Sequence, residues 1–280
     1  MTELMVWLPL VAVLLAIDFA AGTLAGQLGV GGGIVIGLYL LFGAINIDPA
    51  VRMHVGIGTS LTSIVATSAV SARAHRRRGS RDPDLLRRWA PWLFLGALGG
   101  TFLAGSVGGP VLGGVFGTVA LAVSLHMAFA PASLRLGKAP PGGVGRGGAG
   151  IVIGGFSAMM GIGGSTLSLP FLSAYGVTVH RAIGTAAAFG FAIALPASIG
   201  FVIAGWNEPA LPRASVGFVN LLGLSFIAPL SVLAAPLGAR PGESAGGARA
   251  QARLRRLSRP DQHQDAARRA GRRLIAKDEE

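Results

Sequence analysis

Two glycine-rich segments hold the residue types best suited to chemistry in this sequence. Residues 29–33 read Gly-Val-Gly-Gly-Gly, and residues 161–165 read Gly-Ile-Gly-Gly-Ser. Glycine runs free backbone N–H groups from helical pairing and let a ligand approach the main chain closely. A helix that starts after such a run presents the positive end of its dipole, which favours an anion. The segments therefore predict an anion-binding site built mainly from backbone groups.

Each segment is followed by the same histidine motif. Residues 54–59 read His-Val-Gly-Ile-Gly-Thr, and residues 180–185 read His-Arg-Ala-Ile-Gly-Thr. The first glycine and the histidine are 25 residues apart in one copy (54 − 29) and 19 in the other (180 − 161). Two motifs in the same order predict an internal repeat, and we assign the extra residues of the first copy to the loop near 46–49.

The side chains of the repeated motifs are expected to complete the anion site. Ionisable groups within membrane spans are functional candidates by default, and hydroxyl groups add further donors. The predicted ligands are Gly31, Gly32, Gly33, His54, Thr59, Gly163, Gly164, Ser165, His180, Arg181 and Thr185. Three secondary candidates are Arg52, Ser60 and Asp18. Snorkelling to the lipid headgroups explains Arg52 equally well, and a structural hydrogen bond explains Asp18 at least as well.

The composition indicates which elements must position these groups. The chain has 280 residues, of which 51% are hydrophobic and only 13% charged, and its mean hydropathy is +0.61. A soluble domain carries about 25% charged residues, and disorder requires low hydrophobicity. Both classes are excluded, so the chain is predicted to be an all-α polytopic membrane protein. Close helix packing explains most of its 44 glycines.

The net charge of +12 does not indicate a nucleic-acid partner. Of the 24 Lys and Arg residues, 11 follow Gly238 and 7 lie within residues 73–88. Basic residues gathered between apolar spans mark the cytoplasmic side of a membrane protein. We therefore expect the lipid bilayer and a small anion as partners, and no nucleic acid.

Apolar runs of about 20 residues are long enough to cross a bilayer as helices. Such runs lie at about 5–27, 52–72, 89–107, 110–130, 180–205 and 214–237. Shorter apolar runs, interrupted by glycine, lie at about 30–45, 149–161 and 163–175. We interpret the shorter runs as two re-entrant or broken-helix hairpins whose tips are the two glycine-rich segments.

The charged loops predict how the spans are oriented. Residues 73–88 are strongly basic, and residues 131–148 contain basic residues but no acid, so both are expected in the cytoplasm. The acidic connections at 46–49 and 207–209 are expected outside, together with the N-terminus. Three spans separate the two histidine motifs. Because this number of spans is odd, the second copy enters the membrane from the opposite side to the first. The sequence therefore predicts an inverted-topology repeat, an arrangement common in secondary transporters.

These elements divide the chain into two expected parts. Residues 1–238 form a transmembrane transport domain, with repeat 1 at about 10–130 and repeat 2 at about 149–238. Residues 239–280 form a basic, polar tail that is expected in the cytoplasm, since its acids and bases are interleaved as on a solvated charged face.

The repeated motifs resemble those of the sulfite exporter TauE/SafE family. The likeness rests on residues 29–33, their weaker copy at 161–165, the two histidine motifs, Gly-Phe-Val-Asn at 217–220, and Pro229 with Pro-Leu-Gly-Ala at 236–239. It covers about residues 10–240. The resemblance implies a multi-pass permease of the cell (plasma or inner) membrane, often an exporter, for sulfite, organosulfonates or related sulfur oxyanions.

The end of the chain departs from the family pattern. Members usually finish with a further apolar span, whereas here Arg240 is followed by Pro-Gly-Glu-Ser and a polar, arginine-rich segment. Such a segment is either a cytosolic extension or a replacement for a lost last span.

Enzymatic function is not indicated by any motif. The chain has no Cys, no Gly-x-Ser-x-Gly elbow and no His-Glu-x-x-His pair, and neither glycine segment leads into Lys-Ser or Lys-Thr as a P-loop does. We expect no enzyme, no cofactor and no bound metal. A non-transporting membrane scaffold and a carrier of a different small anion remain as alternatives, and the anion, the direction of transport, the coupling ion and the oligomeric state stay open.

Overall fold

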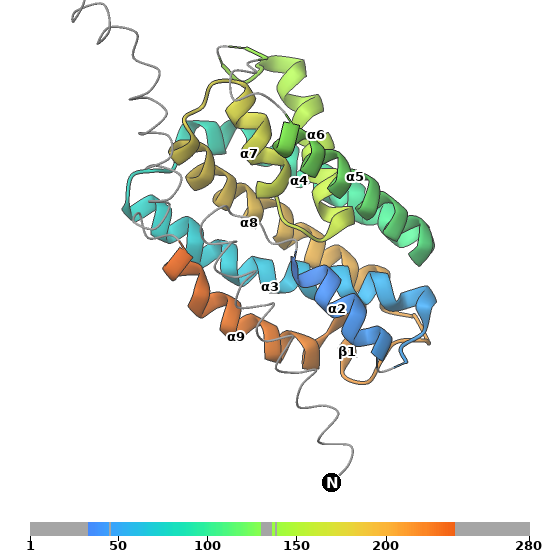
Figure 1. The fold of residues 1–280 in the computed structure, drawn as a ribbon. Helices are drawn as coiled ribbons and strands as arrows, with labels where there is room; N and C mark the ends of the chain where they lie inside the picture. The colour runs from blue at the N-terminus through green and yellow to red at the C-terminus, as the bar shows by residue number, and fades with distance from the viewer. Residues whose placement is uncertain (1–32, 45, 130–135, 138, 239–280) are drawn as a thin grey trace, which may run out of the picture. The chain divides into compact units, whose positions relative to one another are not determined.

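The computed structural model describes residues 33–44, 46–129, 136–137 and 139–238, all within the first unit of the chain, Met1–Ala239. The expected first span at about 5–27, residues 29–32 and the polar tail lie outside these described residues. Within them the secondary structure is almost entirely helical (Figure 1). The helices are α2 (Gly33–Ala44), α3 (Pro49–Arg77), α4 (Pro83–Ser106), α5 (Gly109–Phe129), α6 (Gly143–Met160), α7 (Ser165–Ala174), α8 (Val179–Ala204) and α9 (Leu221–Gly238).

The helical class and the membrane assignment agree with the expectation from composition. Three helices among the described residues are long and apolar enough to cross a membrane: Pro49–Arg77, Gly109–His126 and Val179–Ala204. They match the predicted runs at 52–72, 110–130 and 180–205.

One predicted span begins later than its hydropathy indicates. Residues 214–220 were expected to belong to the span at 214–237, but they form an antiparallel pair of short strands, β1 (Ser215–Val216) and β2 (Val219–Asn220), before α9. Gly217 at the turn has a φ of 54°, in the left-handed region. A hydropathy average does not detect this turn, because most residues around it are apolar or small.

Two helices start at prolines that follow an aspartate. Asp48 accepts a hydrogen bond from the backbone N of Ala50 at 2.9 Å and caps α3, whose first residue is Pro49. Asp82 caps α4 in the same way, since its Oδ1 accepts from the backbone N of Leu85 at 3.1 Å. An acidic cap followed by proline is a strong helix start, because the cap satisfies a free N–H and proline needs none.

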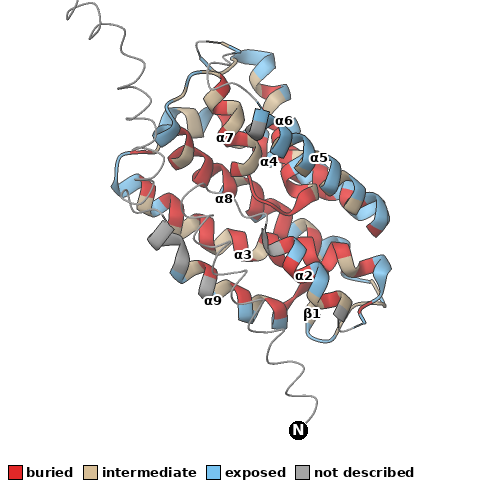
Figure 2. Ribbon diagram, in the orientation of Figure 1, coloured by how far each residue is buried: buried red, intermediate tan, exposed pale blue. Residues whose placement is uncertain are grey.

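Helices α3 and α8 form the buried centre of the described structure. They pack on each other, with α2 and α9 also against α3, and α4 and α7 also against α8. Figure 2 shows buried residues along both central helices, whereas α5 is largely exposed. In a membrane the exposed apolar face of α5 suits contact with lipid.

Glycines let α4 and α6 approach each other at backbone distance. A Cβ atom added at Gly96 would overlap the carbonyl oxygen of Ile151, and one at Gly100 would overlap that of Gly155. A Cβ at Gly154 would likewise overlap the carbonyl oxygen of Leu93. Small residues serve this role in membrane helices generally. These glycines therefore have a packing function and are not part of an anion site.

Candidate functional site

The turn between α6 and α7 is the described part of the predicted anion site. Helix α6 ends at Met160 and α7 begins at Ser165, so residues 161–164 interrupt the helical backbone. Gly161 has a φ of 66° and Gly163 a φ of 71°. Residues with a side chain rarely adopt this left-handed conformation, so glycine is required at both positions. We call residues 161–164 the α6–α7 tip.

On one side, the α6–α7 tip lies against the middle turns of α3. The Oγ of Ser60 donates a hydrogen bond to the carbonyl oxygen of Gly161 at 2.8 Å. A Cβ atom at Gly161 would lie 3.1 Å from the Cα of Ile57, and one at Gly163 would lie 3.2 Å from the Cγ2 of Ile64. All three partners belong to the central part of the 29-residue helix.

On the other side, the α6–α7 tip lies against the middle turns of α8. A Cβ atom at Gly164 would be 3.1 Å from the carbonyl carbon of Phe189 and 3.2 Å from the backbone N of Gly190. These residues are near the centre of α8, which runs over Val179–Ala204. The chain therefore reverses direction halfway along the two helices that form the buried centre.

This reversal leaves the N-terminus of α7 inside the protein. Ser165, the first residue of the helix, is only 1% exposed. Gly164 occupies the cap position and offers no side-chain hydrogen bond. Among the described residues, the first N–H groups of α7 thus lack a side-chain cap, and such groups can bind a ligand that accepts hydrogen bonds.

The start of α2 approaches the same region. Gly33 is the first residue of α2, and the side chain of Val35 lies 3.0 Å from the position of a Cβ atom on Gly161. The beginning of α2 and the α6–α7 tip are therefore neighbours, although they are far apart in sequence. Gly31, Gly32 and Asp18, which were predicted to join the site, lie outside the described residues.

His54 has a structural partner away from the α6–α7 tip. Its Nε2 is 3.0 Å from the carbonyl oxygens of both Ala104 and Val107, at the C-terminal end of α4. Both partners can only accept, so Nε2 carries the proton and the ring caps the free carbonyls of that helix. The ring also stacks on Phe218, with a centroid separation of 4.9 Å.

His180 and Arg181 lie at the exposed first turn of α8. Arg181 forms an ion pair with Asp82, with 2.6 Å between Nη2 and Oδ2. About ten residues of helix, or roughly 15 Å of rise, separate these side chains from Gly190 beside the α6–α7 tip. The structure therefore does not bring this predicted pair to the tip.

Arg52 is also distant from the tip. It lies in the first turn of α3, where its Nε and Nη2 donate to the carbonyl oxygen of Ile47 at 3.2 and 2.7 Å. Its guanidinium carbon is 5.6 Å from the centre of the Tyr39 ring.

The two threonines of the histidine motifs make equivalent contacts. The Oγ1 of Thr59, on α3, accepts a hydrogen bond from the backbone N of Asn220 at 2.9 Å. The Oγ1 of Thr185, on α8, accepts one from the backbone N of Asp82 at 3.1 Å. Asn220 lies between α8 and α9, and Asp82 lies between α3 and α4. Thr59 on α3 thus binds the segment that follows α8, and Thr185 on α8 binds the segment that follows α3.

The glycine before each threonine repeats the correspondence. A Cβ atom at Gly58 would overlap the carbonyl oxygen of Phe218, two residues before Asn220. One at Gly184 would lie 2.6 Å from the carbonyl oxygen of Ser80, two residues before Asp82. We call these contacts the Thr59 clasp and the Thr185 clasp.

The held residues correspond as well. The Oδ1 of Asn220 accepts from the backbone N of Gly223 at 2.8 Å, three residues ahead, at the start of α9. Asp82 caps α4 with the same three-residue spacing to Leu85. Both clasps therefore end on the cap of the following helix.

Four buried serines were not identified from the sequence. The hydroxyl groups of Ser63 and Ser71 on α3, Ser157 on α6 and Ser168 on α7 are buried without a hydrogen-bond partner among the described residues. An unpaired polar group is costly inside a membrane protein, so such groups mark positions for a water molecule or a ligand. Single serines inside apolar helices carry no recognisable motif, although Ser168 comes only three residues after the glycine-rich segment.

Comparison with known proteins supports the inference from the residues. The family model described as Sulfite exporter TauE/SafE matches residues 14–256. A protein of Haemophilus influenzae (strain ATCC 51907 / DSM 11121 / KW20 / Rd), described as "Probable membrane transporter protein", is 30% identical over 229 residues, which cover 80% of this chain and 86% of that protein. No solved structure matches the chain.

Proposed function

The chain belongs to the sulfite exporter TauE/SafE family, a family of membrane transporters, and we propose that it exports sulfite, an organosulfonate or a related sulfur oxyanion. The anion binds at the α6–α7 tip, on the backbone N–H groups of Gly163, Gly164 and Ser165. Gly31, Gly32 and Gly33 of the first glycine segment are proposed to bind the same anion, as the sequence motif predicts. The protein acts in the cell membrane, with its polar tail in the cytoplasm.

The observation that carries this proposal is the depth of the α6–α7 tip. Irregular backbone is tolerated at membrane depth only where it is buried in protein or lines a cavity. The tip lies against the middle of α3 and α8, and the uncapped start of α7 is buried there. A helix N-terminus in that position attracts an anion without a charged side chain.

The chemistry around the tip suits an oxyanion that must be released again. Between Met53 and Ala72 on α3 the chain has no Lys, Arg, Asp or Glu, and the same holds for α8 from Ala182 to Ala204. The nearby donors are the Ser165 hydroxyl and backbone N–H groups, since the Ser60 hydroxyl already donates to Gly161. Neutral donors bind sulfite or sulfonate oxygens less strongly than an arginine does, so the anion is bound without being trapped.

An inverted repeat is the architecture that we propose around this site. It is supported by the matched packing, since α2 lies on α3 as α7 lies on α8, and α9 lies on α3 as α4 lies on α8. It is supported further by the Thr59 and Thr185 clasps, whose partners correspond residue by residue. A chance resemblance between two helices does not account for a matched glycine, threonine and helix cap together.

The two clasps then act as the gates of the transporter. By the positive-inside rule the basic connection held by Thr185 lies in the cytoplasm, and the connection held by Thr59 lies on the outer side. Opening one clasp while the other stays closed exposes the tip to one side at a time, as alternating access requires. The exposed Arg181–Asp82 pair adds little to the cytoplasmic clasp, since surface ion pairs contribute about 0–1 kcal/mol.

A binding screen on the purified protein tests the proposed substrate class. Sulfite, sulfate, thiosulfate, sulfoacetate and taurine are added in turn, and the unfolding temperature is measured. One or more of these sulfur oxyanions or sulfonates is expected to raise it, while chloride leaves it unchanged. The shift should disappear in Gly164→Val and persist in Gly148→Val, because a Cβ atom at Gly148 meets nothing within 4 Å. Equal shifts with all anions, or with none, would rule out the substrate class.

A further inference from the structure

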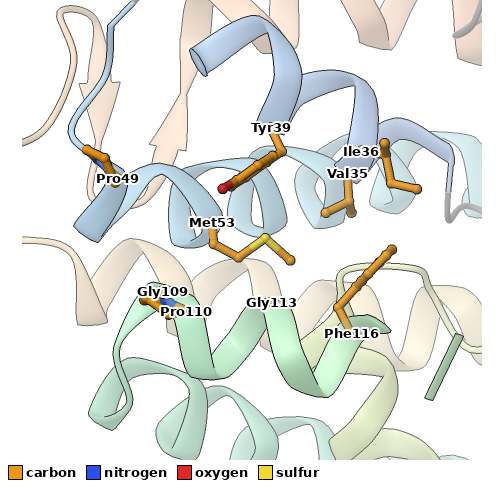
Figure 3. A pocket seen from close by; sticks show the side chains of 9 residues that line it. All are labelled: Val35, Ile36, Tyr39, Pro49, Met53, Gly109, Pro110, Gly113 and Phe116. Atoms are coloured by element: carbon orange, nitrogen blue, oxygen red, sulfur yellow. The ribbon is translucent and has the colours of Figure 1, made fainter. Parts of the chain in front are cut away.

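An apolar cavity lies between α2, the start of α3 and the start of α5. Its volume is about 360 Å³, at the small end of ligand pockets. Figure 3 shows Tyr39 and Ile36 on α2, Met53 on α3 and Phe116 on α5 around the space. The lining offers no charged side chain, so the cavity does not suit the transported anion.

Exposed apolar side chains surround the cavity, which suits an opening toward the hydrocarbon of the bilayer. Ile36 is 51% exposed and belongs to its lining, as does the partly exposed ring of Tyr39. Leu40 and Val111, the next residues along α2 and α5, are more than half exposed. In a chain that spans the membrane, apolar side chains with such large exposed fractions are expected to contact lipid. The occupant must therefore enter from the membrane.

A cation stands beside the cavity at the end of a spanning helix. Arg52 lies in the first turn of α3, one residue before Met53, and its guanidinium faces the Tyr39 ring. Two of its nitrogens are held by the carbonyl oxygen of Ile47. Among the described residues no carboxylate forms an ion pair with it. Its position is thus fixed and no described carboxylate neutralises its charge, and an arginine at the end of a spanning helix suits contact with lipid headgroups.

We propose that this cavity binds one acyl chain of an anionic phospholipid, whose phosphate group pairs with Arg52. Apolar lining provides the affinity for the chain, and guanidinium–phosphate contact selects the headgroup. The inference concerns a site separate from the α6–α7 tip and does not depend on the transported substrate.

Two variants separate the parts of the lipid site. Gly113 lines the cavity, and a Cβ atom there meets nothing within 4 Å, so Gly113→Leu fills the space without a backbone clash. Gly114→Leu is its control, because Gly114 is equally open but does not line the cavity. Arg52→Gln removes the charge, with Arg52→Lys to restore it and the exposed Arg213→Gln as control.

Native mass spectrometry of the full chain in detergent measures lipid binding directly. Dioleoyl phosphatidylglycerol and dioleoyl phosphatidylethanolamine are titrated against each variant. The unmodified protein is expected to prefer the anionic lipid about fivefold, as one arginine near a membrane surface allows. Arg52→Gln should remove this preference and Arg52→Lys should retain it. Gly113→Leu should weaken both lipids about tenfold, and the two controls should match the unmodified protein.

Three results would overturn the proposal. The unmodified protein would bind both lipids with equal affinity, Arg52→Gln would keep the full preference for the anionic lipid, or Gly113→Leu would bind both lipids as tightly as the unmodified protein. If Arg52→Gln fails to fold, the headgroup comparison in the unmodified protein and the Gly113→Leu titration still decide the question.

Discussion

At the scale of single residues, two different constraints require glycine in the α6–α7 tip. Gly161 and Gly163 need a left-handed backbone, whereas Gly164 has an ordinary φ of −74°, but a Cβ atom there would lie 3.1 Å from the carbonyl carbon of Phe189 on α8. The sequence motif predicted that this segment is special, but it could not show which constraint acts at which glycine.

Replacement of Gly163 by alanine tests the backbone constraint. The φ of 71° and the nearby Ile64 should make Gly163→Ala less stable by about 1–2 kcal/mol. Gly148→Ala, in open space on α6, should change stability by less than about 0.5 kcal/mol. Unfolding in detergent, followed by intrinsic fluorescence, measures both. Equal stability of the two variants would show that the backbone of the tip can change conformation without cost, which would contradict the constraint at Gly163.

The two clasp threonines should respond alike to removal of the hydroxyl. Thr59→Val leaves the backbone N of Asn220 without its partner, and Thr185→Val does the same to Asp82. A buried donor without a partner costs about 1–3 kcal/mol, so both variants should lose stability, with Thr185→Val at the lower end of this range because the N–H of Asp82 is only partly buried. Thr118→Val on the exposed face of α5 is the control. A loss in one clasp only would argue against their equivalence.

The histidines illustrate how far the residue patterns could predict the site. The repeat of His54 and His180 was correct as a sequence observation and predicted two ligands. The structure gives His54 the free carbonyls of α4 and leaves His180 exposed at a helix start. A histidine that caps a helix distant in sequence leaves no local signal, because its partners are backbone atoms about 50 residues away.

At the scale of elements, the α4–α6 contact explains a large part of the glycine content. Gly100→Ala should push the helices apart, since its Cβ would overlap the carbonyl oxygen of Gly155. Overpacking of this kind costs about 1–3 kcal/mol. Gly99→Ala, one position along the same helix and in open space, should be neutral or slightly stabilising. Thermal unfolding of the two variants makes the comparison, and equal midpoints would contradict the close packing.

The spans were predictable where length and hydropathy agree, as in α3, α5 and α8. Element ends were less so. Helix α6 begins at Gly143, ahead of the apolar run predicted at 149, and α9 begins only after the β1–β2 turn. Both differences arise from backbone and loop geometry, which an average over apolar residues does not record.

At the scale of the whole molecule, the orientation that we propose in the membrane rests on the basic loops. The chain has no cysteine, so single cysteines report accessibility without background. A cysteine at exposed Asn207 should react with a membrane-impermeant maleimide on intact cells, and one at exposed Arg88 should react only after permeabilisation. Labelling of the Arg88 position from outside would reverse the proposed topology and exchange the two gates.

Transport itself is best measured with the purified chain in proteoliposomes loaded with radiolabelled sulfite. The unmodified protein is expected to release sulfite well above the rate of protein-free liposomes, and Gly148→Val should behave in the same way. Gly164→Val should stop the flux, because a branched side chain would press on Phe189 and Ile193 and close the approach to the start of α7. Flux at the protein-free rate from a correctly folded, unmodified protein, or full flux from Gly164→Val, would contradict transport of this anion through the α6–α7 tip.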